Sequence, residues 1–299
     1  MRLSASTRRY VPGEAETNVA VSLPGSSRHW LSAVAAATVE CMTTSTQPNS
    51  DTSALPLTGR VAVVSGSTSG IGAATARRLA ADGAKIAVLG RREERLRELA
   101  DELEAFPVTV DVTDRKALEH AAGAIHNRLG RVDLVVAAAG AMLAAPFEEA
   151  DQDEWDRMLD TNVRGLLSTG RAFADDLIAA GAAGERADLV HVGSIGGHQI
   201  FPTYGVYGAT KAAVAHLTHN LRAELGPRGV RVKNIEPGLV ATELGDDMQH
   251  DAGRSVLEEL RSQIDPLEPE QIAAAIAFAV AVPAHVNVAE LVVVPTPQG

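Results

Sequence analysis

Three residues in the second half of the chain have the types and spacing of a general-acid site. Tyr207 and Lys211 are four residues apart, so a helix over 203–225 places them one turn apart on one face. A nearby ammonium favours the phenolate and lowers the pKa of a tyrosine from about 10 toward working pH. Ser194 follows a strand-like run and can hydrogen-bond the carbonyl oxygen that Tyr207 would protonate. The trio predicts protonation of an alkoxide by Tyr207, although such a tyrosine–lysine pair is also a common surface contact.

A glycine-rich turn joins the first strand-like run, 60–65, to a helical stretch, 71–82. Its spacing is G-x-x-x-G-x-G, and no lysine follows it as a P-loop requires. Glycines at such a turn let backbone N–H groups approach a pyrophosphate that faces the helix N-terminus, so the turn predicts a dinucleotide site. The residues expected to contact the cofactor are Gly66, Ser67, Ser69, Gly70, Ile71 and Gly72.

The end of the second strand-like run, 85–89, distinguishes between the two nicotinamide dinucleotides. A carboxylate there holds a ribose 2′-hydroxyl, whereas an arginine accommodates a 2′-phosphate. The chain has Arg91 and Arg92 at this point and no acid before Glu93. We therefore expect NADP rather than NAD. The alternative is that both arginines only begin a solvated helix and pair with its glutamates.

The pattern of the whole chain must bring these residues together. Short β-branched runs alternate with longer amphipathic stretches, which is typical of a parallel sheet with crossover helices. We predict an α/β fold in which a Rossmann-type, doubly wound, seven-stranded parallel sheet forms a single domain. Residues 152–180 are predicted to be helical, and 244–264 to form a helical insertion after the sixth strand. The expected strands are 60–65, 85–89, 107–111, 132–137, 187–193, 230–235 and 290–294.

Composition excludes several classes of protein. The chain has 299 residues, of which 45% are hydrophobic, enough to bury a sizeable core. Its 27 basic and 38 acidic residues give a net charge of −11, which argues against a nucleic-acid partner. No segment reaches the length of a membrane span, and the single Cys41 cannot form an intramolecular disulfide. We expect a cytoplasmic protein with a disordered extension over 1–56, an alternative start at Met42, and an NADP-binding catalytic domain over 57–299.

Over about 57–299, the sequence resembles the classical short-chain dehydrogenases/reductases. The matching motifs are GSTSGIG at 66–72, DVT at 111–113, DTNVRG at 160–165, Ser194 followed thirteen residues later by the YxxxK of Tyr207 and Lys211, and IEPGLVATEL at 235–244. The sequence as a whole, including its ending VVVPTPQG, also resembles a bacterial, NADP-dependent group of the family that contains clavulanate dehydrogenase.

The resemblance implies hydride transfer between a nicotinamide and a carbonyl carbon. Ser194 would polarise the carbonyl oxygen, Tyr207 would donate the proton, and Lys211 would lower the tyrosine pKa and bind the ribose. Asn162 would hold a water linked to the lysine. Further cofactor contacts are implied for Asp111, Val112, Ala138, Gly140, Pro237, Gly238, Val240 and Thr242, beside Tyr207 and Lys211. The family also implies a homo-oligomer, a dimer or a tetramer.

The chain departs from the family pattern at two places. Where the family usually has NNAG after the fourth strand, the sequence is AAAG at 137–140, which removes side-chain hydrogen bonds near the adenosine pocket. Gly193 replaces the first serine of a common serine pair. The altered AAAG site keeps a second interpretation open, a non-catalytic NADP-binding sensor or scaffold, although such a protein has no need for all four catalytic residues.

The substrate is constrained least. The residues expected to line its pocket are Met142, Leu143, Ile195, His198, Tyr204 and Leu239, together with part of 243–264. Most of them are apolar or aromatic, which favours a hydrophobic or cyclic ketone, or the matching secondary alcohol, over a small charged acid. His216 and His219 lack the partners of a metal motif, so we expect no metal.

Overall fold

The structure, a computed structural model, describes residues 55–298. The predicted extension, apart from its last two residues, and the alternative start at Met42 lie outside the described residues and stay predictions. Among the described residues, no helix combines the length and the apolar character that crossing a membrane requires.

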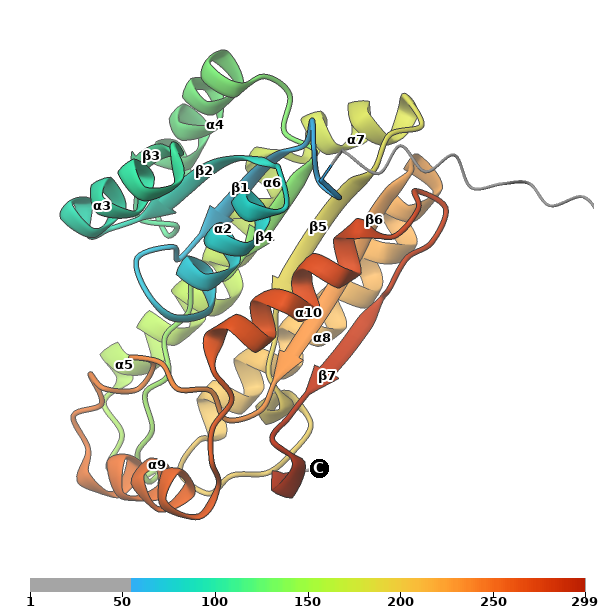
Figure 1. The fold of residues 1–299 in the computed structure, drawn as a ribbon. Coiled ribbons are helices and arrows are strands. Elements are labelled where there is room, and N and C mark those ends of the chain that lie inside the picture. The colour runs from blue at the N-terminus through green and yellow to red at the C-terminus, as the bar shows by residue number, and fades with distance from the viewer. Residues whose placement is uncertain (1–54, 299) are drawn as a thin grey trace, which may run out of the picture. The chain divides into compact units, whose positions relative to one another are not determined.

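Seven parallel strands form one sheet in the order β3-β2-β1-β4-β5-β6-β7 (Figure 1). The strands are β1 (Val61–Ser65), β2 (Lys85–Gly90), β3 (Phe106–Thr109), β4 (Leu134–Ala137), β5 (Ala187–Val192), β6 (Val230–Pro237) and β7 (Glu290–Val293). This confirms the predicted doubly wound sheet, with strand ends that differ from prediction by at most two residues. The strand order reverses between β1 and β4, and ligands of such sheets bind outside the carboxyl ends of the strands at that point.

The central strands are hydrophobic throughout because helices cover both faces of the sheet. In β1, Ala62 and Val64 pack into one core, whereas Val61 and Val63 pack into the core on the opposite face. The first core includes side chains of α2, α3 and α10, and the second includes side chains of α4, α7 and α8. The helices are α2 (Gly70–Ala81), α3 (Glu93–Leu103), α4 (Arg115–Leu129), α5 (Gln152–Leu159), α6 (Leu166–Ala172), α7 (Ala174–Ala182), α8 (Gly205–Leu225), α9 (Asp251–Gln263) and α10 (Pro269–Ala281).

Two predicted helical stretches differ in detail from the structure. The stretch 152–180 is interrupted by a π-helical turn at Asp160–Gly165 and by Phe173, whose φ of −115° separates α6 from α7. A π-helical turn inside a helix is frequently found at a functional site, and this one contains Asn162. Within 244–264, only α9 is helical, and the residues that precede it form turns and irregular structure.

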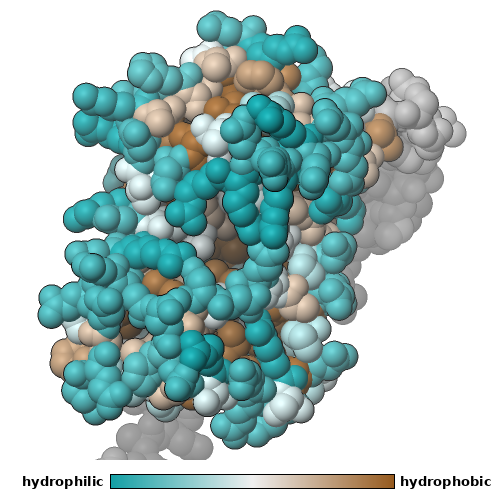
Figure 2. Space-filling model, turned by 90° about the vertical axis from the view of Figure 1, so that its left-hand side faces the viewer, coloured by the Kyte–Doolittle hydropathy of each residue, from teal (hydrophilic) through white to brown (hydrophobic). Residues whose placement is uncertain are grey.

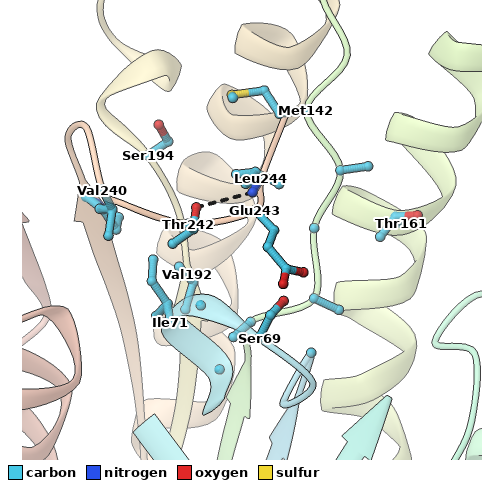
Figure 3. A pocket seen from close by; sticks show the side chains of 18 of the residues that line it. Ser69, Ile71, Met142, Thr161, Val192, Ser194, Val240, Thr242, Glu243 and Leu244 are labelled. Carbon is cyan, nitrogen blue, oxygen red and sulfur yellow. Dashed lines mark hydrogen bonds between the residues drawn. The ribbon is translucent and has the colours of Figure 1, made fainter. Parts of the chain in front are cut away.

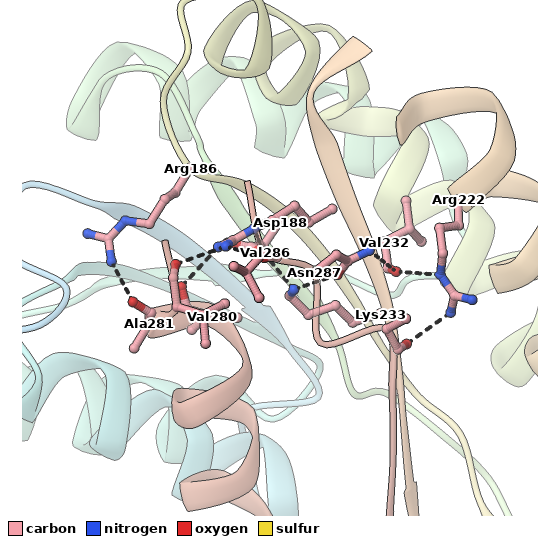
Figure 4. Close-up of polar contacts among 12 residues, drawn as sticks. Arg186, Asp188, Arg222, Val232, Lys233, Val280, Ala281, Val286 and Asn287 are labelled. Carbon is pink, nitrogen blue, oxygen red and sulfur yellow. Dashed lines mark hydrogen bonds and ion pairs between the residues drawn. The ribbon is translucent and has the colours of Figure 1, made fainter. Parts of the chain in front are cut away.

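A buried network of charges occupies the amino end of the sheet, opposite the end where ligands bind. Asp188 on β5 accepts hydrogen bonds from Arg60 at 2.9 Å and from Arg231 at 2.9 and 2.7 Å, and the Nζ of Lys233 lies 3.3 Å away. Asp188 and Lys233 are fully buried. Burial lowers the pKa of Lys233 to about 8, although Asp188 opposes this shift. Asn287 accepts a 2.7 Å hydrogen bond from the same ammonium (Figure 4).

The arginines of this network also bind the C-terminal end of α10. Arg231 donates to the carbonyls of Val280 and Val282, and Arg186 donates to the carbonyl of Ala281 (Figure 4). Carbonyls at a helix C-terminus have no partner within the helix and carry partial negative charge, so cations stabilise them. The network therefore attaches α10 to β5 and β6 at the amino edge.

Candidate active site

A cavity of about 610 Å³ opens at the carboxyl edge of the sheet, within the size range of small-molecule sites. Residues at or just after the ends of six strands line it, so it spans the point where the strand order reverses. On the face that Figure 2 shows, hydrophobic residues lie in a recess between hydrophilic rims. The predicted residues that line the cavity are Gly66, Ser69, Gly70, Ile71, Gly72, Arg91, Arg92, Asp111, Val112, Ala138, Gly140, Met142, Ser194, Ile195, Tyr204, Tyr207, Lys211, Pro237, Gly238, Leu239, Val240 and Thr242.

The glycine-rich turn needs its glycines for conformation and for space. Gly66 has a φ of +71°, and a Cβ there would lie 2.7 Å from the backbone nitrogen of Ala139. A Cβ on Gly72 would lie 2.3 Å from the carbonyl oxygen of Gly66. The first turn of α2 contains no acidic residue, its N-cap side chain makes no capping bond, and residues 69–72 line the cavity, so the first backbone N–H groups of the helix are available to an anion. The turn fits the phosphates of a dinucleotide.

One predicted contact residue of this turn points away from the cavity. The Ser67 hydroxyl donates a 2.6 Å hydrogen bond to the carbonyl of Val64, and the residue is buried. Ser67 therefore holds the turn against β1. Its neighbour Thr68 lines the cavity instead.

Arg92 lies across the glycine-rich turn at the edge of the cavity. Its Nε and Nη2 donate to the Thr68 hydroxyl at 2.9 and 2.7 Å, and Nη2 also donates to the Ser69 hydroxyl at 2.7 Å. Its Nη1 donates to Glu243 at 2.7 Å, and Arg95 donates to both carboxylate oxygens of the same residue. These hydrogen bonds lower the pKa of Glu243 to about 2. The predicted alternative, in which Arg92 pairs with the glutamates that begin α3, is wrong, because its acid comes from the segment after β6.

Arg91 and Asp111 face each other at the ends of β2 and β3. The Nη1 of Arg91 lies 3.7 Å from a carboxylate oxygen of Asp111. Thr113 donates to Asp111 through its backbone N–H and its hydroxyl. Burial raises the pKa of Asp111, but these two hydrogen bonds and Arg91 outweigh that effect, so the pKa is below its usual value. Asp111 is therefore ionised at neutral pH and held in a fixed position.

Ser194, Tyr207 and Lys211 meet at the other end of the cavity, as their spacing predicts. The Ser194 Oγ accepts a 3.0 Å hydrogen bond from the N–H of Gly196, which orients the side chain at the end of β5. Burial raises the pKa of the Tyr207 phenol, and a hydrogen bond with Ser194 opposes this rise. The predicted lowering of that pKa by Lys211 is not what the structure shows.

Lys211 is held beside the tyrosine and points to the backbone. Its Nζ donates a 2.9 Å hydrogen bond to the carbonyl of Val192 and lies 5.8 Å from the centre of the Tyr207 ring. Burial lowers the pKa of the Lys211 ammonium to about 8. The lysine therefore lies beside the Tyr207 ring, while the pKa of the phenol is set by burial and by the hydrogen bond with Ser194.

Asn162 lies behind the cavity wall and does not line the cavity. Its Oδ1 accepts from the N–H of Ala141 at 2.8 Å, and its Nδ2 donates to the carbonyl of Ala141 and to the hydroxyl of Thr210. The amide thus connects the loop after β4 to α8. Thr161, beside it in the π-helical turn, lines the cavity instead.

Both departures from the family pattern have a structural counterpart. In the AAAG segment, the N–H of Ala138 donates to the Ser65 hydroxyl at 3.2 Å, so a β1 side chain supports this loop. At the other position, a Cβ on Gly193 would lie 2.5 Å from the amide oxygen of the buried Asn234. A serine there would require Asn234 to move. Gly193 therefore leaves space for the Asn234 side chain.

Two predicted substrate-pocket residues do not line the cavity. Leu143 is buried beneath it, in one hydrophobic cluster with Tyr204. His198 turns outward, and its Nε2 lies 2.8 Å from a carboxylate oxygen of Glu236. Loop residues carry no periodicity from which side-chain direction can be predicted, and both residues lie in loops or short turns.

Charged side chains that no sequence motif indicated also line the cavity. Arg157 on α5 pairs with Asp247, and Arg261 on α9 donates to the carbonyl of Thr242 at 3.1 Å. Asp246 lies 3.5 Å from Arg261. Further lining residues are Thr68, Gly90, Val110, Ala139, Ala141, Thr161, Val192, Gly193, Gly196, Phe201, Glu243, Leu244, Asp247, Leu257, Leu260 and Gln298. The insertion therefore contributes to the lining, and the acidic residues that it places there are Glu243, Asp246 and Asp247.

Within residues 55–298, no three His, Cys, Asp or Glu side chains lie together in a way that could hold a metal ion.

A sequence model of the short chain dehydrogenase family matches residues 60–253. Sulfoacetaldehyde reductase 2 of Chromohalobacter salexigens is 39% identical over 249 residues, which cover 80% of this chain and 95% of that protein.

Solved structures agree with these sequence matches. A closed form of serine dehydrogenase complexed with NADP+ is 34% identical, with a TM-score of 0.74, over 80% of this chain and 96% of that one. A short chain dehydrogenase from Burkholderia cenocepacia, in complex with NADP, is 29% identical, with a TM-score of 0.71, over 82% of this chain and all of that one. None of these three proteins is named for clavulanate, so membership of the clavulanate dehydrogenase group stays a prediction.

Proposed function

This chain belongs to the short chain dehydrogenase family, and from that premise we propose that it is an NADP(H)-dependent oxidoreductase that interconverts a carbonyl compound and an alcohol. The observation that carries the proposal is the cavity itself. Ser194, Tyr207 and Lys211 line one end of it, while the glycine-rich turn and Arg92 line the other. A dinucleotide that extends between these ends brings its reactive part to the general acid.

Each of the catalytic residues has a role that its surroundings support. Bound NADPH supplies the hydride. The Ser194 hydroxyl donates a hydrogen bond to the carbonyl oxygen of the substrate, and Tyr207 donates the proton that the resulting alkoxide takes up. The raised pKa of Tyr207 keeps the phenol protonated at neutral pH. Lys211 supplies positive charge beside the phenolate that remains. Asn162 positions α8 by its hydrogen bonds to Ala141 and Thr210.

We propose that the chain prefers NADP over NAD. Arg91 and Arg92 line the cavity beside the glycine-rich turn, where arginines bind a 2′-phosphate. The hydroxyls of Thr68 and Ser69 hold Arg92 against that turn. The two solved relatives described above were both determined with NADP bound.

For the substrate, we propose a hydrophobic or cyclic ketone, reduced to a secondary alcohol. Apolar and aromatic side chains line the end of the cavity near Ser194. They are Met142, Ile195, Phe201, Tyr204, Leu239, Leu257 and Leu260. Such side chains favour an apolar substrate body around one polar group.

A second substrate class, a small carbonyl compound with an anionic group, is favoured by Arg261. This arginine lines the cavity, and its partner oxygen on Asp246 lies at the long distance of 3.5 Å. Donors on its guanidinium therefore remain available to a sulfonate or carboxylate. The relative from Chromohalobacter salexigens is named for sulfoacetaldehyde, a compound of this class.

A carbonyl panel tests the proposed function and separates the two substrate classes. NADPH oxidation is followed at 340 nm with cyclic ketones, aromatic ketones and small anionic aldehydes. We expect turnover of at least one class, faster with NADPH than with NADH. Tight NADPH binding without turnover of any carbonyl compound would favour the sensor or scaffold instead.

We also propose that the protein is a cytoplasmic homo-oligomer with a small-molecule substrate. Support for an oligomer comes from the edge strand β7, where Val292 is 60% exposed, and from Phe278 on the adjoining α10, which is 59% exposed. Exposed apolar side chains of this size mark interaction surfaces when they lie together. Light scattering after gel filtration gives the mass, and a monomer would contradict this proposal.

A further inference from the structure

An acidic residue from the segment after β6 reaches across the cavity to the glycine-rich turn. In Figure 3 the carboxylate of Glu243 lies beside the hydroxyl of Ser69. Glu243 and Thr242 both line the cavity. Glu243 also binds Arg92, although the two residues are 151 positions apart in the sequence. Two separate parts of the chain therefore meet where the phosphate-binding arginines lie.

The Arg92 guanidinium already has partners for most of its donors. Thr68 and Ser69 accept from its Nε and Nη2, and Glu243 accepts from its Nη1. Arg95 presents its own Nη1 to Glu243, at 2.7 Å from one carboxylate oxygen and 2.9 Å from the other. A phosphate that uses either arginine fully must replace these contacts.

The charges around this end of the cavity nearly balance. Three arginines, 91, 92 and 95, face two carboxylates, Asp111 and Glu243. A carboxylate so close to the site of a phosphate disfavours the dianion by like-charge repulsion. In NAD-binding folds, this repulsion comes from an acid at the end of the second strand. Here Arg91 follows the second strand, and the acidic residue, Glu243, comes from the segment after β6.

We propose that Glu243 competes with the 2′-phosphate of NADP for Arg92 and Arg95, and so limits how strongly the chain prefers NADP over NAD. The proposal rests on the proposed function, since it assumes that these arginines bind the 2′-phosphate. Glu243 is thus a specificity-determining residue of the cofactor site. It does not touch the reacting atoms.

The test compares Glu243→Gln with a matched control, Glu102→Gln. Glu102 holds Arg77 through two hydrogen bonds, and its side chain is 47% exposed, against 48% for Glu243. It does not line the cavity. Dissociation constants for NADPH and NADH are measured by titration calorimetry on the full chain, with thermal unfolding as a check on the fold.

We expect Glu243→Gln to increase the ratio of the NADH to the NADPH dissociation constant about tenfold, mainly through tighter NADPH binding. Glu102→Gln should leave the ratio unchanged. An unchanged ratio in Glu243→Gln, a weaker NADPH affinity, or an equal loss for both cofactors would overturn the proposal.

A second pair of variants separates this inference from the proposed function. In Arg92→Ala, NADPH binding should weaken. When Glu243→Gln is added to Arg92→Ala, the ratio of the NADH to the NADPH dissociation constant should increase by less than tenfold. If Arg92→Ala and Arg91→Ala both leave the cofactor ratio unchanged, the proposed role of the arginines fails. If they change it and Glu243→Gln does not, only the inference about Glu243 fails.

Discussion

The two edges of the sheet use the same kinds of residue for opposite purposes. At the amino edge, Arg60 and Arg231 are buried, and the carboxylate of Asp188 and several backbone carbonyls take up their donors. At the carboxyl edge, the side chains of Arg91 and Arg92 are 68% and 43% exposed. Buried cations with full hydrogen bonding hold the fold together, whereas exposed cations with exchangeable partners can bind a ligand.

The comparison shows that residue type alone does not identify an anion site. What distinguishes the two clusters is whether a ligand can replace the present partner. A ligand cannot displace Asp188, because that side chain is fully buried at the amino edge. Glu243 lies in a segment of turns after β6, and that carboxylate is half exposed.

The largest expected effect comes from breaking the amino-edge network. Asp188→Asn leaves three buried cations without their shared counter-charge, so the free energy of unfolding should fall by about 3–5 kcal/mol. Urea denaturation measures the change. If the variant does not fold, Arg231→Lys provides a milder test in the same direction. A loss below about 1 kcal/mol would mean that the backbone carbonyls alone hold these arginines.

The second effect is a pH dependence of stability that originates at the same edge. Because burial lowers the folded-state pKa of Lys233 to about 8, the unfolded chain binds more protons between about pH 8 and 10.5. The free energy of unfolding should therefore rise across this window, by at most about 3 kcal/mol from this residue. Urea denaturation at a series of pH values should show a smaller rise in Lys233→Met. An identical rise in the variant would place its origin elsewhere, for example at Lys211.

At the carboxyl edge, an arginine substitution should affect binding and leave stability nearly unchanged. Arg92→Ala should weaken NADPH binding about tenfold to a hundredfold, since a charge-assisted hydrogen bond is lost. NADH binding should change little. The control is Arg97→Ala, which removes an exposed arginine of α3, the helix that Arg92 caps; Arg97 does not line the cavity. An equal effect of both substitutions would show that only the general charge of α3 matters.

The smallest expected effect is that of salt. Raising the ionic strength from about 0.05 to 0.5 M should weaken NADPH binding roughly threefold more than NADH binding, because exposed charges are screened. The loss of unfolding free energy that Asp188→Asn causes should change much less with ionic strength, because the amino-edge network is buried. A salt effect of equal size on the two cofactors would contradict the assignment of the exposed arginines.

Local patterns predicted the sheet and the ends of the cavity. Tyr207 and Lys211 are neighbours because both belong to α8, and the glycines of the first turn are close in sequence. Alternation of β-branched runs with helices was sufficient to predict seven parallel strands.

Contacts between distant segments were not predicted. Nothing near Arg92 in the sequence indicates Glu243, and nothing in the run around Arg231 indicates that its charge is buried beside Asp188. His198 was predicted to line the pocket but turns outward, because a short turn after β5 has no repeating face from which side-chain direction can be predicted. A buried lysine such as Lys233 is recognised only once the strands that surround it are placed.

The most direct test of the central claim, that the carboxyl-edge cavity reduces carbonyl compounds with NADPH, is the rate of NADPH oxidation by Tyr207→Phe. The comparison is made with a substrate that the unchanged chain turns over. The variant keeps the ring and removes only the hydroxyl that donates the proton. We expect kcat to fall by about a hundredfold to ten-thousandfold while NADPH still binds. If the variant keeps more than about a tenth of the wild-type kcat, proton donation by Tyr207 is not the basis of the activity.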